Sequence, residues 1–266
     1  MEVIIFDTAE QVAARCAQIF AETVQTHPKC TLGLATGSTP IAMYKKLVEK
    51  HQNDGLSFKE VKSYNLDEYV GLSGDHHQSY RHFMNENLFD QVDINKENTF
   101  VPPGDAENPM QGAAEYEQDI VNNGGIDLQV LGIGGNGHIG FNEPTSSLGS
   151  RTRVKTLTQK TVDDNSRFFA EDEFQPTLSI TMGIKTILDS KRVILLATGE
   201  GKADAIADAI EGPLAAICPA SALQLHDKAT FIIDRAAASK LKMTDYYKYV
   251  LVKQDNLVGQ FGDPRV

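Results

Sequence analysis

Short apolar segments alternate with longer amphipathic ones along most of this chain, and this pattern restricts its fold most strongly. The apolar segments have the length and composition of buried strands. They cover residues 3–6, 31–35, 61–66, 127–133, 192–197 and 230–233. This βα alternation predicts an α/β fold: an open, mostly parallel, doubly wound (Rossmann-like) sheet with helices on both faces.

Helices are expected between these strands. Thr8 can cap the first helix, and Thr39 is expected to cap the second, with Pro40 at its first helical position. Further helices are expected at residues 79–92 and 110–121, and around Ile206 and Ile210.

The chain shows no repeat, linker or low-complexity tract. Its 266 residues can therefore form one domain, over residues 1–266, with a sizeable core. Residues 151–177 fit the alternation least well, so they are expected to form a mobile lid.

Charge and hydropathy exclude several classes of partner. The net charge of -11 argues against nucleic acid. No apolar run approaches the ~18 residues of a membrane span. The N-terminus reads as a short strand rather than a signal peptide, so a cytoplasmic location is expected.

The cysteines and histidines give no metal-ligand pattern. The three cysteines are widely spaced, and Cys16 and Cys30 are expected to be buried free thiols. His76 and His77 are expected to form a surface loop pair without further ligands. We therefore expect no metal and no other cofactor.

The segment Leu131–Pro144 places Asn136, His138 and Glu143 directly after a predicted strand. A histidine near a carboxylate at such a position suggests proton transfer. The glycines also match a dinucleotide-binding pattern, but that site needs a helix directly after the turn, and Gly140 and Pro144 disfavour one. A purely structural turn is the other alternative.

Three more predicted strand ends carry polar groups. The loop formed by Thr36, Gly37, Ser38 and Thr39 opens a helix and could bind a phosphate. Asp67 and Glu68 follow another strand and could supply a general base. Lys202 begins a helix, where a cation is unfavourable unless an anion is bound. The alternatives are a capped turn, a solvated acidic pair and an exposed lysine.

Ligands of open α/β sheets bind beyond the carboxyl ends of the strands. Arg167 could add a fork for a phosphate. Together these groups indicate a sugar-phosphate enzyme that uses neither metal nor nucleotide. A carboxylate base and a separate acid/base suit aldose–ketose chemistry.

The motifs resemble those of the glucosamine-6-phosphate deaminase (isomerase) family over nearly the whole chain. The resemblance rests on residues Leu32–Pro40, Asn65–Leu72, Gly137–Pro144, Ser150–Lys155 and Asn165–Phe168. It implies conversion of glucosamine 6-phosphate and water to fructose 6-phosphate and ammonia in amino-sugar catabolism. Such an enzyme is a hydrolase by overall reaction, with an isomerase-type mechanism.

The resemblance also implies residue roles. Asp67 matches the base that moves the C2 proton to C1 through an enolamine, and His138 matches the ring-opening acid/base. Glu143 and Asn136 match partners of His138. Many members carry Asp at the position of Asn136, and an amide can orient the imidazole but supplies no charge. The loop Gly37–Thr39, with Arg167 and Lys202, matches the phosphate site.

Some family members are hexamers activated by N-acetylglucosamine 6-phosphate, and others are monomers without allostery. Ser146, Arg153 and Lys155 match residues of the effector site. A homo-oligomer with such an effector is therefore possible for this chain, and a monomer is the alternative.

Two other functions fit parts of the pattern. A 6-phosphogluconolactonase-like hydrolase would share the fold and a Gly-His motif, but Asn142–Pro144 and Asp67–Tyr69 resemble the deaminase. A non-catalytic sugar-phosphate sensor would need no acid/base groups and is usually joined to a DNA-binding module, for which this chain has no spare segment.

Overall fold

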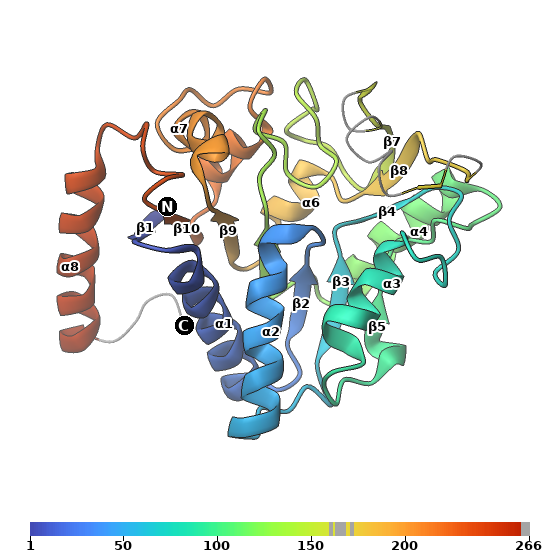
Figure 1. The fold of residues 1–266 in the computed structure, drawn as a ribbon, viewed down its shortest axis with the longest axis horizontal. Helices are drawn as coiled ribbons and strands as arrows, with labels where there is room; N and C mark the ends of the chain where they lie inside the picture. Colours follow the sequence, from blue (N-terminus) through green and yellow to red (C-terminus); the bar gives the residue numbers. More distant parts are fainter. Residues whose placement is uncertain (160–161, 163–168, 171–172, 262–266) are drawn as a thin grey trace.

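The computed structural model describes residues 1–159, 162, 169–170 and 173–261. Its centre is a parallel seven-stranded sheet in the order β1-β10-β9-β6-β2-β3-β5 (Figure 1). The strands are β1 (Glu2–Phe6), β2 (Thr31–Leu34), β3 (Lys62–Asn65), β5 (Thr99–Phe100), β6 (Leu128–Leu131), β9 (Val193–Ala197) and β10 (Ala229–Asp234). The prediction of an open, parallel α/β sheet is confirmed.

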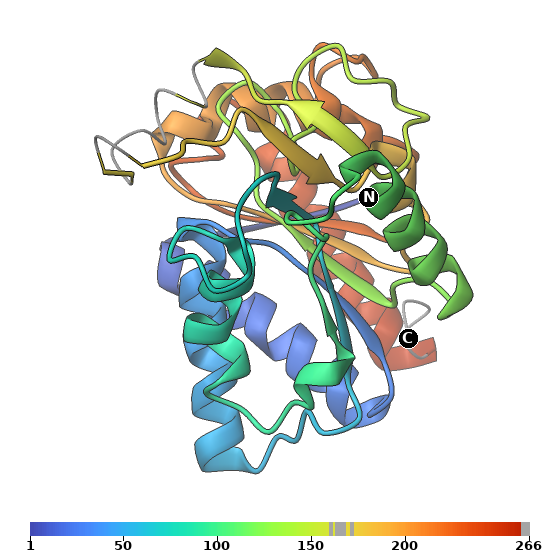
Figure 2. The same cartoon turned by 90° about the vertical axis from the view of Figure 1, so that its right-hand side faces the viewer.

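Helices cover both faces of this sheet, and α1 and α2 lie on the face opposite α4 (Figure 2). The α-helices are α1 (Ala9–Thr26), α2 (Ser38–Asp54), α3 (Tyr80–Met84), α4 (Pro109–Asn122), α6 (Ile184–Leu188), α7 (Ala203–Ile210) and α8 (Thr244–Phe261). Shorter turns are η1 (Asn85–Phe89), η2 (Lys96–Asn98), η3 (Glu200–Lys202) and η4 (Pro219–Leu225).

Most buried apolar side chains form one cluster between the sheet and its helices. Val12, Cys16 and Phe20 project from one stripe of α1 into this cluster, and each is at most 1% exposed. Burying such side chains removes apolar surface from water and is the main force that holds the layers together. Cys16, Cys30 and Cys218 are buried free thiols, as expected for the first two.

A second, antiparallel sheet was not predicted. It has the order β4-β8-β7 and lies above the carboxyl end of the central sheet (Figure 2). Its strands are β4 (Asp67–Tyr69), β7 (Arg153–Thr156) and β8 (Leu178–Thr181). Asp67–Tyr69 is therefore a strand, and not the open turn that the alternative reading of Asp67 and Glu68 required.

Two predicted helix boundaries are wrong. Helix α2 begins at Ser38 after Gly37, which has φ 104°, so Thr39 lies inside the first turn and caps nothing. Pro40 is tolerated there because the first-turn N–H groups have no partner within the helix. The helix expected at residues 79–92 ends earlier, since α3 passes into the π-helix η1 and stops at Phe89.

The predicted lid, residues 151–177, lies partly outside the described residues. Its first part is the strand β7, which pairs with β8 from Arg153↔Thr181 to Thr156↔Leu178. A separate finding concerns membranes: none of the helices in the described ranges is long and apolar enough to cross one.

Candidate active site

Four neighbouring strands bring the predicted site residues to one edge of the central sheet. β9, β6, β2 and β3 lie side by side and run parallel, so their carboxyl ends lie on the side to which the β2 arrow points, toward the top of Figure 1. A cavity of ≈ 220 Å³ lies at this edge. It is lined by Ala35, Thr36, Gly37, Ser38, Thr39, Pro40, Leu66, Asp67, Tyr80, Gly132, Ile133, Gly134, His138, Gly140 and Phe141.

The turn between β2 and α2 forms one wall of this cavity. No side chain caps the amino end of α2, and Thr36, Gly37, Ser38 and Thr39 all line the cavity. The first-turn N–H groups of a helix, together with its dipole, attract an anion. This wall can therefore bind a phosphate group.

Asp67 is a buried carboxylate that also lines the cavity. It is 5% exposed and accepts no hydrogen bond among the described residues. Burial, followed by repulsion from the Glu68 carboxylate, raises the pKa of Asp67 to about 8. A carboxylate with such a pKa is a strong base when it is ionised.

Glu68 faces away from the cavity, because adjacent residues of a strand point to opposite sides. Its carboxylate accepts N–H groups of Tyr69 at 2.8 Å, Tyr80 at 2.9 Å and Arg81 at 3.0 Å. Burial raises the pKa of Glu68 to about 7, although these N–H donors favour its ionised form. Glu68 therefore anchors the start of α3, and only Asp67 is placed for chemistry.

His138 lines the same cavity as Asp67 and lies next to Glu143. His138 Nδ1 is 3.3 Å from Glu143 Oε1, but the angles do not make a hydrogen bond. Glu143 is buried, and the His138 side chain is 29% exposed. The carboxylate can thus support a positive charge on the imidazole by proximity.

Asn136 does not touch the imidazole, contrary to the role expected for an orienting amide. Its Nδ2 donates to Glu143 Oε2 at 2.7 Å, and its Oδ1 accepts the His138 backbone N–H at 3.2 Å. The amide therefore positions Glu143 and the loop. An amide N–H suits this place because a second carboxylate would repel Glu143.

Two glycines are required by the close packing of this loop. A Cβ on Gly134 would lie 2.3 Å from the His138 ring, so no larger residue fits beneath the imidazole. Gly140 has φ 56°, and its Cβ would lie 3.2 Å from Asp67 Oδ2. No helix occurs between Gly132 and Gly149, as the argument against a dinucleotide site required.

Sequence reasoning missed the groups that hold this loop to the second sheet. Asn142 Nδ2 donates to the carbonyls of Ile139 at 2.9 Å and Met182 at 2.8 Å. The Phe141 N–H donates to Thr181 Oγ1 at 3.1 Å. Only the quoted motif Gly137–Pro144 pointed to Asn142, and no local signal pointed to Thr181.

Tyr80 was also missed as a cavity residue. Its ring lies parallel to that of Phe141, with centroids 6.1 Å apart, and its hydroxyl donates to the Tyr69 hydroxyl at 3.2 Å. These aromatic rings form an apolar wall beside Asp67. Ser79, which caps α3, was the nearest sequence signal.

Lys202 and Arg167 are the two basic residues predicted to bind the phosphate, and the structure describes only Lys202. Lys202 ends η3, after the end of β9, but it does not line the cavity. Its loop approaches the glycine loop, since the Gly201 carbonyl would lie 3.9 Å from a Cβ on Gly135. Arg167 lies outside the described residues.

Two of the three predicted effector residues, Arg153 and Lys155, lie on β7 of the second sheet, and Ser146 lies in the loop after Glu143. Ser146 is buried, and its Oγ has no hydrogen-bond partner in the described part of the chain. Arg153 donates to Asn142 Oδ1 at 2.9 Å and forms no ion pair with a described residue. Burial lowers the pKa of Arg153. Lys155 follows two positions later on β7 and thus projects from the same face.

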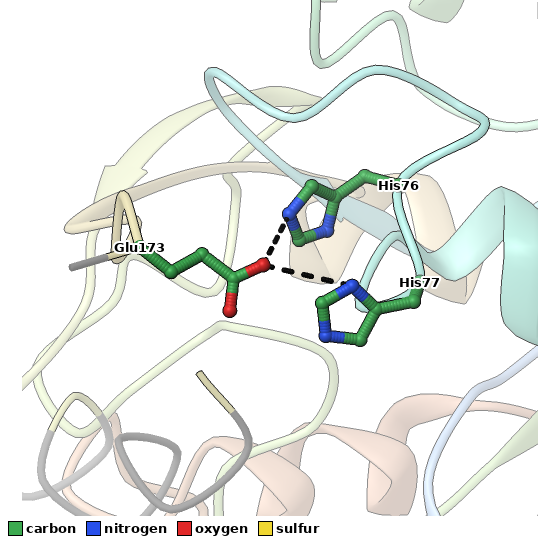
Figure 3. Close-up of side chains that lie close together, drawn as sticks. All are labelled: His76, His77 and Glu173. Atoms are coloured by element: carbon green, nitrogen blue, oxygen red, sulfur yellow. Dashed lines mark ion pairs between the residues drawn. The ribbon is translucent and has the colours of Figure 1, made fainter. Parts of the chain in front are cut away.

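His76 and His77 do have a third polar neighbour, contrary to the sequence expectation. Glu173 Oε1 lies 2.9 Å from His76 Nε2 and 3.6 Å from His77 Nδ1 (Figure 3). The three groups are close enough together to hold a metal ion. However, the Gln78 N–H donates to His76 Nδ1 at 3.1 Å, which leaves the ring proton of neutral His76 on Nε2.

Comparisons with known proteins agree with this geometry. A family model described as glucosamine-6-phosphate isomerases/6-phosphogluconolactonase matches residues 6–232. A glucosamine-6-phosphate deaminase of Shewanella woodyi is 60% identical over 260 residues, covering 98% of each chain. One from Cellvibrio japonicus is 58% identical over 262 residues, covering 98% of this chain and 100% of the relative.

Solved structures have the same fold. A monomeric glucosamine-6-phosphate deaminase superposes with a TM-score of 0.87 at 44% identity, over 90% of this chain and 99% of that chain. A 6-phosphogluconolactonase from Trypanosoma cruzi has a TM-score of 0.74 at 20% identity, over 91% of this chain and 97% of that chain. The second likeness concerns the fold alone.

Proposed function

The chain belongs to the glucosamine-6-phosphate isomerase/6-phosphogluconolactonase family, and we propose that it deaminates glucosamine 6-phosphate to fructose 6-phosphate and ammonia. One observation carries the assignment to this site. Asp67, a buried carboxylate without a hydrogen bond to any described residue, shares a cavity with His138 and with the uncapped amino end of α2. A sugar phosphate needs these three groups together.

The phosphate binds at the start of α2. There the backbone N–H groups of the first turn and the hydroxyls of Ser38 and Thr39 can donate to its oxygens. Lys202 and Arg167 complete the phosphate site in this proposal. Anchoring the phosphate holds the other end of the sugar toward Asp67 and His138, which lowers the entropy cost of the reaction.

His138 opens the sugar ring. It takes the proton from the C1 hydroxyl and returns one to the ring oxygen as the C1–O5 bond breaks, leaving an open-chain aldehyde. Glu143 lies 3.3 Å from Nδ1 and stabilises the imidazolium that forms between these two transfers. Asn136 holds the Glu143 carboxylate in this position.

Asp67 then moves a proton between two carbons. It removes the proton from C2, and the electron pair of that bond forms the C1=C2 double bond of an enolamine while the carbonyl π pair moves to O1, which takes a proton from water. Asp67 returns the proton to C1, which becomes a CH₂OH group, and C2 becomes an iminium carbon. The raised pKa of Asp67 suits both steps, because the base and its conjugate acid are both accessible near neutral pH.

Water completes the reaction at C2. It adds to the iminium carbon, and the resulting carbinolamine expels ammonia to leave the ketone. The overall change is therefore a hydrolysis of a C–N bond, whereas the central step is an isomerisation. The buried free thiols fit a reducing compartment, and a cytoplasmic location is part of the proposal.

The direct test is ammonia release from glucosamine 6-phosphate by the purified chain. We expect equal amounts of ammonia and fructose 6-phosphate, and far weaker activity on unphosphorylated glucosamine. Faster hydrolysis of 6-phosphogluconolactone than release of ammonia would instead assign the lactonase reaction. Binding of sugar phosphates without turnover would assign the sensor.

Regulation by N-acetylglucosamine 6-phosphate is a second part of the proposal. Partly buried Arg153 forms no ion pair with a described residue, and Ser146 Oγ has no hydrogen-bond partner among the described residues, so an anion could satisfy both groups. Lys155→Ala should weaken activation by this sugar phosphate and leave basal turnover unchanged, since Lys155 lies outside the cavity. Equal activation of both proteins would remove this site from the proposal, and their oligomeric state should be measured alongside.

A further inference from the structure

Glu173 joins two segments that are distant in the sequence. Its Oε1 lies 2.9 Å from His76 Nε2 (Figure 3). Its Oε2 accepts the Ala170 N–H at 2.8 Å. Both carboxylate oxygens are thus used, one toward the loop 73–79 and the other within its own segment. Glu173 and His76 are mostly buried, with side-chain exposures of 20% and 24%.

The His76 ring is held for this contact from its other side. The Gln78 N–H donates to Nδ1, so the remaining ring proton points from Nε2 to the carboxylate. A metal at Nε2 would need that proton to leave and Nδ1 to be protonated, which would break the bond from Gln78. The arrangement is therefore built as a hydrogen bond to a carboxylate, which is stronger than one between neutral groups.

The loop that carries His76 continues directly into a helix that lines the cavity. Ser79, three residues after His76, caps α3 by accepting the His82 N–H at 3.0 Å, and its own N–H donates to the His76 carbonyl at 2.8 Å. The first residue of α3 is Tyr80, which lines the cavity. The position of loop 73–79 thus sets the position of the Tyr80 ring.

The residues beside Glu173 contact the same aromatic wall of the cavity. Phe169 packs against a small apolar cluster that includes Tyr69, Phe141 and Leu157, and its ring lies over His76. Phe174 packs on the backbone at Gly71, where a Cβ would come within 2.7 Å of its ring. Phe141 in this cluster also lines the cavity. Both ends of the contact therefore support the aromatic wall.

We propose that His76 and Glu173 are a positioning pair that holds the aromatic wall of Tyr80 and Phe141 in place for sugar-phosphate binding. The inference rests on the proposed function of the cavity. Neither residue touches the substrate. The pair fixes the position of the Tyr80 and Phe141 rings before the substrate binds. It therefore affects substrate affinity more than the rate of the chemical steps.

Steady-state kinetics of four variants test the pair. His76→Ala and Glu173→Ala should each raise KM for glucosamine 6-phosphate roughly five- to tenfold, because only part of the lost contact's free energy reaches the aromatic wall. The kcat should stay within about twofold. His76→Gln keeps an N–H donor and should restore most of the affinity.

His77→Ala is the matched control, because His77 is adjacent but 3.6 Å from Glu173 Oε1. It should leave KM within about twofold of the parent value. The double variant of His76 and Glu173 should be no worse than either single variant, since one contact is lost in each. Equal effects of the two histidine variants, or a fall in kcat with unchanged KM, would overturn the proposal.

Amide hydrogen exchange separates this proposal from the proposed function, because it needs no substrate. The Ala170 amide should exchange faster in His76→Ala than in His77→Ala. Faster exchange with unchanged KM would refute the positioning role and leave the deaminase assignment intact. Absence of ammonia release by the parent would refute the proposed function instead. Tight binding of Zn²⁺ that His76→Gln abolishes would overturn the hydrogen-bond assignment in favour of a metal site.

Discussion

Buried polar side chains at the two edges of the central sheet differ in whether they have hydrogen-bond partners within the protein. At the amino edge, Asp127 accepts the Thr31 N–H at 2.7 Å and pairs with Lys191 at 2.6 Å. At the carboxyl edge, Asp67 is buried without a hydrogen bond to any described residue, and the buried His138 Nδ1 also lacks one. Asp127 at the first edge is satisfied within the protein, whereas Asp67 and His138 Nδ1 at the second are not satisfied by described residues.

This difference separates stability from function within one sheet. A paired polar group stabilises the fold modestly, whereas a buried unpaired group costs about 1–3 kcal/mol. The unpaired groups occur where a ligand can complete them. Buried polar groups without partners within the protein therefore mark the candidate active site. This division between the two edges can be tested by separate substitutions at each edge.

The largest expected effect is on the chemistry of Asp67. Asp67→Asn should lower kcat by about 10²–10⁴, the usual contribution of a general base. The affinity for the sugar phosphate should stay within roughly tenfold, because the amide fills the same space. Rapid-quench turnover and equilibrium binding measure the two quantities. Near-normal turnover would mean that the unpaired carboxylate has no catalytic role.

The next effect separates ring opening from proton transfer. His138→Gln should strongly reduce activity on cyclic glucosamine 6-phosphate, because the amide cannot exchange protons near neutral pH. It should reduce C2-proton exchange of an open-chain analogue much less, which NMR in D₂O can follow. Glu143→Gln should behave as a milder form of the same variant. Equal losses on both substrates would place His138 in the transfer at carbon.

A third prediction concerns the free energy of unfolding as a function of pH. The pKa of Asp67 is raised by burial, so between about pH 4 and pH 8 the folded state holds a proton that the unfolded state has lost. The stability that this proton provides is complete below about pH 4 and is lost as the pH rises through 8.

Asp67→Asn should therefore stabilise the protein at pH 8, on the order of 5 kcal/mol as an upper value, and change little at pH 4. Urea titrations at the two pH values measure this difference. Equal stabilities at pH 8 would show that the buried carboxylate carries no cost. The kcat/KM of the parent should also rise with pH toward 8, since the base must be ionised.

The smallest effect is expected at the amino edge. Asp127→Ala should lower the free energy of unfolding by about 1–2 kcal/mol through loss of its two contacts. It should leave kcat/KM unchanged, because this edge lies at the far end of the strands. Urea unfolding and kinetics together measure the result. A loss of activity without a loss of stability would contradict the division between the edges.

Much of the central sheet could be predicted from local patterns. The runs at residues 192–197 and 230–233 are continuous apolar segments, which are typical of strands buried on both faces. The second sheet gave no such signal. Its strands, such as Asp67–Tyr69 and Arg153–Thr156, are three or four residues long and mostly polar, and they pair with β8, which is distant from β4 in the sequence. Short polar strands form only when tertiary contacts select them.

The sequence by itself determined the order of strands and helices, and which reactive side chains follow each strand. Only the tertiary structure decided what those side chains do. Pairing of β4 with β8 turned Asp67 toward the cavity and Glu68 toward α3. The fold of the glycine loop directs the Asn136 side-chain amide to the Glu143 carboxylate rather than to the His138 imidazole. Local patterns depend on neighbours along the chain, whereas a side chain's pKa, partners and direction depend on groups that only folding brings near it.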